Sequence, residues 1–179
     1  MRQWPTFEAT AERAENIDAL DGLILLGSFA SGAPDELSDI DLIAVAKTGR
    51  FTEAWEARQR LSRDALVAWD LRPKADAAGH NWLTPDFVKV DCTIVDPDSG
   101  SRDLAEPIVV LVGPDSVADR FARISLETVR ERASKIADEQ EQQVFDPDQM
   151  DVGELIDWKL SELKHAVRRA QGRQRDAAL

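Results

Sequence analysis

The chain has 179 residues, of which 43% are hydrophobic and 31% are charged, and its net charge at pH 7 is −12. These values are typical of a globular protein with a real core, as one domain or as a domain with a helical appendage. The negative charge argues against a general nucleic-acid binder, because sequence-independent affinity comes from Lys and Arg side chains that neutralise phosphates. A single cysteine, Cys92, excludes an internal disulfide framework and a multi-cysteine zinc site.

Membrane and export signals are not expected. No apolar run approaches the ~20 residues of a membrane span. The first five residues also lack the apolar core of a signal peptide. We therefore expect no membrane contact and, by default, a cytoplasmic location.

The first element predicted along the chain is a helix. Thr6 is a candidate N-cap, and apolar side chains repeat at helical spacing until Asp21-Gly22 ends the element. A strand follows at residues 23–26, where four apolar residues stand in a row, and Gly27-Ser28 interrupts it. We expect the helix to lie against the sheet that contains this strand.

Two carboxylates open the second predicted strand, which continues through the apolar residues 42–46. Asp39 and Asp41 are two positions apart, so their side chains face the same way along a strand. Neighbouring carboxylates repel each other and are costly near a core unless a cation lies between them. Hard oxygen ligands favour Mg²⁺ or Mn²⁺, which bind substrate phosphates at the same time. Backbone N–H groups and the hydroxyl of Gly27-Ser28 can contact phosphate oxygens, so these residues point to a metal and polyphosphate site.

A helix and a loop are predicted after the second strand. Residues 51–69 carry apolar side chains at helical spacing, and Pro73 ends the helix. Residues 74–85 show no period, so we expect a loop there, with His80 at the surface. This loop carries no motif, although loops near a site often contribute to function.

An acidic residue lies in the middle of the third predicted strand, at residues 87–95. An isolated Asp in an apolar strand is disfavoured by propensity and by desolvation, so Asp91 requires a partner. Lys89 shares its face and is either a structural ion-pair partner or a contact to a phosphate. The alternation puts these residues opposite the core face, which consists of Val88, Val90, Cys92 and Ile94.

The last strand and two helices complete the prediction. Residues 108–112 are a short apolar run that predicts the final strand of the sheet. From Asp115 apolar residues at helical spacing predict one helix that includes Val117, Phe121 and Ile124 and continues past Val129 to Ile136. A second helix runs from Val152 to Val167. Two helices joined by a short polar loop form an antiparallel hairpin, which can pack on the sheet, bind an acceptor or pair with another copy of the chain.

The pattern Gly27-Ser28 followed by Ser38-Asp39-Ile40-Asp41-Leu42 resembles the signature of the nucleotidyltransferase superfamily that shares the DNA polymerase beta palm. It resembles in particular the small bacterial members, the aminoglycoside and minimal nucleotidyltransferases. The resemblance implies an α+β fold with a mixed, mostly antiparallel sheet flanked by helices. It also implies a palm domain at residues 1–113 and a C-terminal helical hairpin at residues 114–179.

The resemblance also implies a set of site residues. The family has a third carboxylate on a later strand, and Asp91 matches that position. Asp39 and Asp41 are then the expected catalytic ligands of two Mg²⁺ or Mn²⁺ ions, with Asp91 a ligand of the catalytic ion alone. The Gly27-Ser28 turn is expected to bind nucleotide phosphates, and Lys89 is a further candidate for that contact.

An enzyme of this family transfers a nucleoside monophosphate from an NTP, expected here to be ATP, to a hydroxyl acceptor and releases pyrophosphate. The acceptor implied is a small molecule such as an antibiotic, or a protein. A separate general base is not assigned, and Asp91, Glu106 and Glu127 are the alternatives. A second hypothesis is an interaction protein resembling the nucleotidyltransferase partner of a toxin–antitoxin pair. In both cases the C-terminal helices are candidates to bind a second copy or a helical partner protein.

Overall fold

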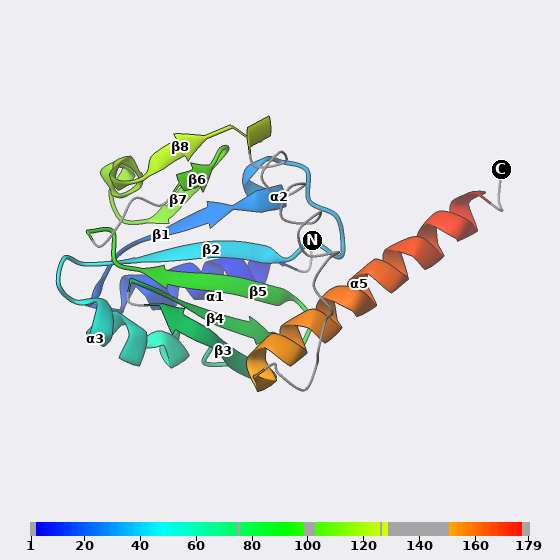
Figure 1. The fold of residues 1–179 in the computed structure, drawn as a ribbon, viewed down its shortest axis with the longest axis horizontal. Helices are drawn as coiled ribbons and strands as arrows, with labels where there is room; N and C mark the ends of the chain where they lie inside the picture. The colour runs from blue at the N-terminus through cyan, green and yellow to red at the C-terminus, as the bar shows by residue number, and fades with distance from the viewer. Residues whose placement is uncertain (1–2, 75, 99–102, 126, 129–150, 177–179) are drawn as a thin grey trace. The chain divides into compact units, whose positions relative to one another are not determined.

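The computed structural model describes residues 3–74, 76–98, 103–125, 127–128 and 151–176 (Figure 1). The chain divides into two compact units, Met1–Gln142 and Gln143–Leu179, and each unit is described by itself. None of the helices within the described ranges combines the length and the apolar composition that a membrane crossing requires.

A mixed six-stranded sheet forms the centre of the first unit, with the strand order β3-β4-β5-β2-β1-β7. Strands β2 and β5 run parallel, and each other neighbouring pair is antiparallel. This confirms the predicted α+β fold with a mixed, mostly antiparallel sheet. The strands are β1 (Leu20–Leu26), β2 (Ile40–Ala46), β3 (Val67–Lys74), β4 (Ala77–Leu83), β5 (Lys89–Val95) and β7 (Val109–Val112).

Short helices and a small second sheet surround these strands. The second sheet pairs β6 and β8 in parallel. In the second unit the structure describes one helix, α5, which confirms the predicted helix that begins at Val152. The remaining elements are α1 (Trp4–Glu15), α2 (Gly27–Ala30), α3 (Phe51–Glu56), the 3₁₀ helices η1 (Arg58–Arg60) and η2 (Asp115–Arg120), the strands β6 (Asp103–Ala105) and β8 (Ala122–Ile124), and α5 (Val152–Asp176).

The two faces of the large sheet bury separate groups of side chains, as the alternation of β2 predicts. We call them the α1-side core and the η2-side core. In Figure 1 helix α1 lies behind β2 and β5, whereas β6 and β8 lie beyond β1. The α1-side core includes Phe7, Leu23, Leu25, Ile40, Leu42, Ala44, Leu61, Val90 and Cys92. The η2-side core includes Ile24, Ile43, Val45, Val95, Leu104, Val117 and Phe121.

The predicted helix at residues 51–69 is wrong over most of its length. Helix α3 ends at Glu56, η1 follows, and β3 begins at Val67. Pairing with β4 decides the conformation of residues 67–71, because this pairing satisfies the backbone groups that a helix would have satisfied internally. Pro73 therefore does not end a helix but lies within β3, an edge strand, between the register positions Leu71 and Lys74.

The predicted loop at residues 74–85 is also wrong, since Ala77–Leu83 forms β4 between β3 and β5. Small residues and Gly79 give this segment little strand propensity of its own, so the two flanking strands impose the conformation. His80 is consequently not at the surface: its exposed fraction is 2%.

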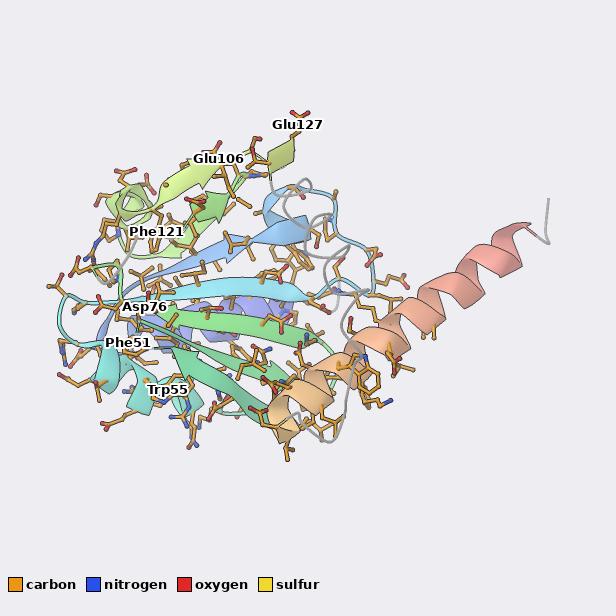
Figure 2. The ribbon with its side chains drawn as sticks, in the orientation of Figure 1. Phe51, Trp55, Asp76, Glu106, Phe121 and Glu127 are labelled. Atoms are coloured by element: carbon orange, nitrogen blue, oxygen red, sulfur yellow. The ribbon has the colours of Figure 1, made fainter. Side chains whose placement is uncertain are left out.

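The predicted helix that begins near Asp115 is wrong over residues 115–124. This segment forms η2 and then β8, and Val117 and Phe121 lie in the η2-side core, where Figure 2 labels Phe121. The apolar residues are spaced as in a helix because the 3₁₀ helix η2 and the extended residue after it bring Val117 and Phe121 into the same core. The rest of that predicted helix, residues 129–136, lies outside the described residues. The hairpin and the domain division at residue 113 therefore stay predictions.

Candidate active site

The register of the parallel pair β2 and β5 brings two of the predicted carboxylates together. Asp41 and Asp91 are direct partners in this register, and both are partly buried. Their neighbours on the chain, Ile40, Leu42, Val90 and Cys92, belong to the α1-side core. Both carboxylates therefore face the opposite side of the sheet, at the end where β2 and β5 begin.

Gly27 lies against the carboxylate of Asp41. Leu26, the last residue of β1, pairs with Asp41, and Gly27 then leaves the strand with a φ of +67°, a conformation that side chains other than Gly disfavour. A Cβ atom on Gly27 would overlap the Oδ2 atom of Asp41. Glycine is thus required here for two reasons, and its absence of a side chain is what lets the turn reach the carboxylate.

Ser28 follows Gly27 in the four-residue helix α2, and hydrogen bonds within this turn hold its backbone. The carbonyl oxygen of Ser28 accepts hydrogen bonds from the backbone N–H of Ala33 at 3.0 Å and from the hydroxyl of Ser31 at 3.0 Å. These bonds fix the backbone between β1 and the loop that leads to β2. The predicted phosphate-binding turn is therefore an ordered segment beside the carboxylates.

Asp39 precedes β2 rather than belonging to it, and side-chain hydrogen bonds hold the loop before it. The buried Ser38 hydroxyl donates to Oδ1 of Asp35 at 2.8 Å and accepts from the backbone N–H of Asp35 at 2.8 Å. Gln3 also donates to the backbone carbonyls of Asp35 and Glu36, at 3.4 Å each. These hydrogen bonds were not predicted, although Asp and Ser are both common in turns.

Lys89 and Asp91 form an ion pair within β5. The Nζ atom lies 2.9 Å from Oδ1 and 3.0 Å from Oδ2 of Asp91, and the Lys89 side chain is 13% exposed. Of the two roles predicted for Lys89, the structure therefore contains the structural ion pair. The ammonium group of Lys89 therefore neutralises part of the charge of Asp91.

Asn81 is a neighbour of the carboxylates that no sequence motif marks. It is the partner of Asp91 in the β4–β5 register and is 3% exposed, and its Oδ1 accepts a hydrogen bond from the backbone N–H of Cys92 at 3.3 Å. The residues Asp41, Asp91 and Asn81 thus form one row across β2, β5 and β4. Residues 74–85 show no strand period of their own, so no sequence signal places Asn81 beside Asp91.

Two alternatives for a general base lie elsewhere. Figure 2 shows Glu106 and Glu127 on the β6 and β8 side of the first unit, apart from β2 and β5. Glu106 is 55% exposed at its side chain, and its Oε1 lies 3.6 Å from Arg123. Of the three alternatives, Asp91 is the one in the carboxylate row.

The residues present suit a hard divalent cation. Asp41 and Asp91 offer carboxylate oxygens on one face, and the missing side chain of Gly27 leaves Asp41 in contact with the backbone of the turn. Within the described ranges, however, no three His, Cys, Asp or Glu side chains are grouped so that they could hold a metal ion. The structure thus brings Asp41 and Asp91 together, whereas Asp39 does not join them in one metal-ligating group.

Comparison with known proteins gives one family. Residues 9–95 match the family model of the nucleotidyltransferase domain, which ends at the last residue of β5 and so includes Gly27, Asp41 and Asp91. No curated protein matches the chain.

Several solved structures are similar over half of the chain. A Cid1 RNA terminal uridylyl transferase is 17% identical, with a TM-score of 0.44, over 52% of this chain and 30% of that chain. Terminal uridylyl transferase 4 from Trypanosoma brucei with bound GTP is 13% identical, with a TM-score of 0.40, over 53% of this chain and 34% of that chain. The polymerase core of TRAMP, an RNA surveillance complex, is 16% identical, with a TM-score of 0.38, over 50% and 29%. The matched part thus spans about a third of each of these proteins.

Proposed function

Because residues 9–95 match the family model of the nucleotidyltransferase domain, we propose that the chain is a metal-dependent transferase of the nucleotidyltransferase superfamily. The reaction moves a nucleoside monophosphate from an NTP, with ATP the first to test, to a hydroxyl group. The acceptor is a small molecule such as an antibiotic, or a protein. Pyrophosphate is the second product.

One observation carries this proposal: Asp41 and Asp91 are register partners on parallel strands, and Gly27 abuts the Asp41 carboxylate. Two carboxylates on one sheet face are stabilised by positive charge, which a divalent cation supplies. Because Gly27 has no side chain, a polyphosphate has access to the backbone N–H groups of the turn beside these carboxylates. Cation and polyphosphate are the two components of an NTP substrate.

The residues have distinct proposed roles. Asp41 and Asp91 would hold Mg²⁺ or Mn²⁺, and Asp39, which lies outside their group in the structure, would have to move toward the cation to act as a further ligand. When bound there, the cation lowers the pKa of the acceptor hydroxyl and stabilises charge on the α-phosphoryl group. The backbone of Gly27-Ser28 orients the β- and γ-phosphates, and Lys89 exchanges its contact with Asp91 for a phosphate oxygen.

The bond changes follow from this arrangement. The acceptor oxygen attacks the α-phosphorus in line, a new P–O bond forms, and pyrophosphate leaves. The acceptor proton is released to a base, for which Asp91 is the candidate in the carboxylate row. The protein contributes positioning and electrostatics, so no nucleophilic side chain is needed.

The test is transfer of label from α-labelled NTPs in the presence of Mg²⁺, with aminoglycosides, lincosamides and a cell extract as acceptor pools. We expect Asp41→Asn to reduce transfer by at least ~100-fold, the usual scale for losing one group that stabilises transition-state charge. The matched control is Asp119→Asn, since Asp119 is an exposed aspartate on η2. Transfer that persists in both Asp39→Asn and Asp41→Asn would refute the proposed site.

The second hypothesis makes a different prediction in the same preparation. An interaction protein resembling the nucleotidyltransferase partner of a toxin–antitoxin pair would co-purify tightly with a small helical protein. It would be non-enzymatic or weakly active, so it would transfer little or no label to any acceptor pool, alone or with that partner. Label transfer by the isolated chain that is lost in Asp41→Asn would decide for the enzyme.

A further inference from the structure

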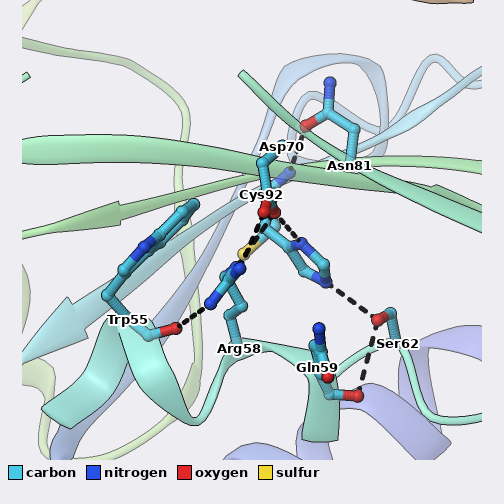
Figure 3. A network of polar contacts seen from close by, with 8 residues as sticks. Trp55, Arg58, Gln59, Ser62, Asp70, Asn81 and Cys92 are labelled. Atoms are coloured by element: carbon cyan, nitrogen blue, oxygen red, sulfur yellow. Dashed lines mark hydrogen bonds and ion pairs between the residues drawn. The ribbon is translucent and has the colours of Figure 1, made fainter. Parts of the chain in front are cut away.

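A serine, a histidine and an aspartate form a hydrogen-bonded chain at the edge of the large sheet (Figure 3). Oγ of Ser62 lies 2.8 Å from Nε2 of His80, and Nδ1 of His80 lies 2.7 Å from Oδ1 of Asp70. Asp70 and His80 are register partners on β3 and β4, and Ser62 lies in the turn between η1 and β3. Both ring nitrogens are thus engaged in the order hydroxyl, imidazole, carboxylate, which is the order that activates a serine nucleophile.

An arginine fixes the carboxylate end of this chain. Arg58 donates from Nε to Oδ1 of Asp70 at 3.0 Å and from Nη2 to Oδ2 at 2.8 Å. Its own position is set by Trp55, whose carbonyl oxygen accepts from Nη1 at 2.9 Å and whose ring lies 4.1 Å from the guanidinium carbon. Asp70 is therefore held in one orientation toward His80.

The protonation states suit a general base. Burial lowers the pKa of His80, and the hydrogen bond to Asp70 offsets part of that effect, so the net shift favours the neutral imidazole. Burial alone would raise the pKa of Asp70, but the hydrogen bonds from Arg58 and His80 outweigh it and lower the pKa. An ionised Asp70 favours the proton on Nδ1 of His80, which leaves Nε2 free to accept the Ser62 proton.

Ser62, His80 and Asp70 line a hollow of about 470 Å³, and Arg63 and apolar side chains complete its lining. Arg63 supplies the positive charge. Leu66 and Val67 supply the apolar part, and they are exposed by 59% and 40%. A hollow with these walls fits an acyl chain on one side and a developing negative charge on the other.

This hollow is separate from the carboxylate row. His80 is the register partner of Cys92, which belongs to the α1-side core, whereas Asp91 and its partner Asn81 face the other side of the sheet. The Ser62 chain therefore cannot take part in the nucleotide transfer proposed above, and its chemistry is independent of that proposal.

We propose that Ser62, His80 and Asp70 form a second active site that hydrolyses carboxylic esters. Oγ of Ser62 attacks the ester carbonyl carbon and its proton moves to Nε2 of His80. The C–O bond to the alcohol breaks, the alcohol takes that proton, and an acyl-Ser62 ester remains. Water then attacks the acyl carbon, its proton passes through His80 to Ser62, and the carboxylic acid is released. Ser62 and His80 are catalytic residues, and Asp70 is a positioning residue.

The test uses the full chain with a fluorophosphonate probe, read by mass spectrometry, and with p-nitrophenyl butyrate hydrolysis. We expect the probe on Ser62, and we expect Ser62→Ala to remove both labelling and hydrolysis. His80→Gln should lower hydrolysis by at least ~100-fold. Ser125→Ala, which changes an exposed serine bonded to Thr128, should leave both readouts unchanged. EDTA should stop label transfer from NTPs but not ester hydrolysis.

The role of Asp70 has its own readout. Asp70 raises the pKa of His80 through its hydrogen bond and charge, so Asp70→Asn should move the half-maximal pH of labelling downward. A purely structural role of Asp70 would lower the folded fraction without moving that midpoint. An unmoved midpoint would remove Asp70 from the proposed site.

A thiol in place of the hydroxyl keeps the test valid if Ser62→Ala fails to fold. Ser62→Cys should react with iodoacetamide at the new thiol, and His80→Gln in the same background should slow that reaction. The native cysteine gives little background, because burial raises the pKa of Cys92 to about 12. A folded wild-type chain that the fluorophosphonate leaves unlabelled at Ser62, or a Ser62→Ala chain that hydrolyses the ester as fast as wild type, would overturn the proposal.

Discussion

The carboxylate row on β2 and β5 and the Ser62–His80–Asp70 chain on β3 and β4 are built in opposite ways. The row holds two like charges side by side, with Lys89 at 2.9 Å from Asp91 as a neutralising cation. In the Ser62–His80–Asp70 chain, each side chain forms a hydrogen bond with the next, and Arg58 pairs with the Asp70 carboxylate. An added cation would therefore stabilise the carboxylate row, whereas the polar groups of the Ser62–His80–Asp70 chain already have hydrogen-bond partners within the protein.

Gly27 offers the largest test of the row, because its substitution is expected to displace one of the two carboxylates. Gly27→Ala adds a Cβ atom that overlaps Oδ2 of Asp41, so Asp41 must move. A displacement of about 1 Å at a catalytic group costs roughly 100-fold in rate. We expect a loss of label transfer of that size, measured in single-turnover assays.

The control for this change is Gly49→Ala. Gly49 has a φ of +73°, like the +67° of Gly27, but a Cβ atom there would meet no atom within 4 Å. Both variants should lose about 1–2 kcal/mol of stability from the left-handed backbone conformation. Equal transfer by the two variants would show that the position of Asp41 does not limit the reaction.

Substitution of Asp70 tests the contribution of the Ser62–His80–Asp70 hydrogen bonds to stability. Asp70→Ala removes the acceptor of His80 Nδ1, and the imidazole, whose side chain is 3% exposed, is left with an unpaired polar group. We expect a loss of about 1–3 kcal/mol in the free energy of unfolding, measured by urea denaturation. Asp64→Ala breaks the exposed ion pair with Arg13 and should cost about 0–1 kcal/mol. Equal losses of unfolding free energy in the two variants would mean that the hydrogen bonds of Asp70 contribute no more than an exposed ion pair.

The dependence of stability on pH gives a smaller and more gradual signal from the same chain. The folded pKa of His80 lies below its ordinary value of 6.5, so between these two values the unfolded state binds more protons than the folded state. His80 then contributes stability that is full above pH 6.5 and is lost as the pH falls through the folded pKa. The slope in that window is at most ~1.4 kcal/mol per pH unit. His80→Gln should flatten it, and an unchanged slope would exclude His80 as its source.

The contrast between the two regions also explains what the sequence could predict. Gly27, Asp39 and Asp41 lie close together in the chain, and strand alternation alone sets the faces of Asp41 and Asp91. The fold class followed from the resemblance of these residues to the nucleotidyltransferase signature, and apolar runs or alternation predicted β1, β2, β5 and β7. The order β5-β2-β1 was not needed to identify Gly27, Asp39 and Asp41, because their spacing is local, whereas Asp91 was assigned by its match to the family pattern.

The second region could not be predicted, because pairing between segments creates it. Residues 51–69 have apolar spacing that suits a helix, yet the last three become β3 once β4 pairs with them. Asp70 and His80 meet through that pairing alone. A lone His in a segment assigned to a loop gave no signal, so its burial and both of its partners were missed.

The central claim is that Asp41 and Asp91 hold a divalent cation together with an NTP, and binding of Mn²⁺ tests it most directly. Electron paramagnetic resonance counts free Mn²⁺ in titrations with a non-hydrolysable ATP analogue, for wild type, Asp41→Asn, Asp91→Asn and Asp119→Asn. We predict that wild type and Asp119→Asn bind Mn²⁺ equally and that the other two lose at least ~10-fold in affinity, which is about 1.4 kcal/mol. Equal Mn²⁺ affinity in all four proteins would contradict the account.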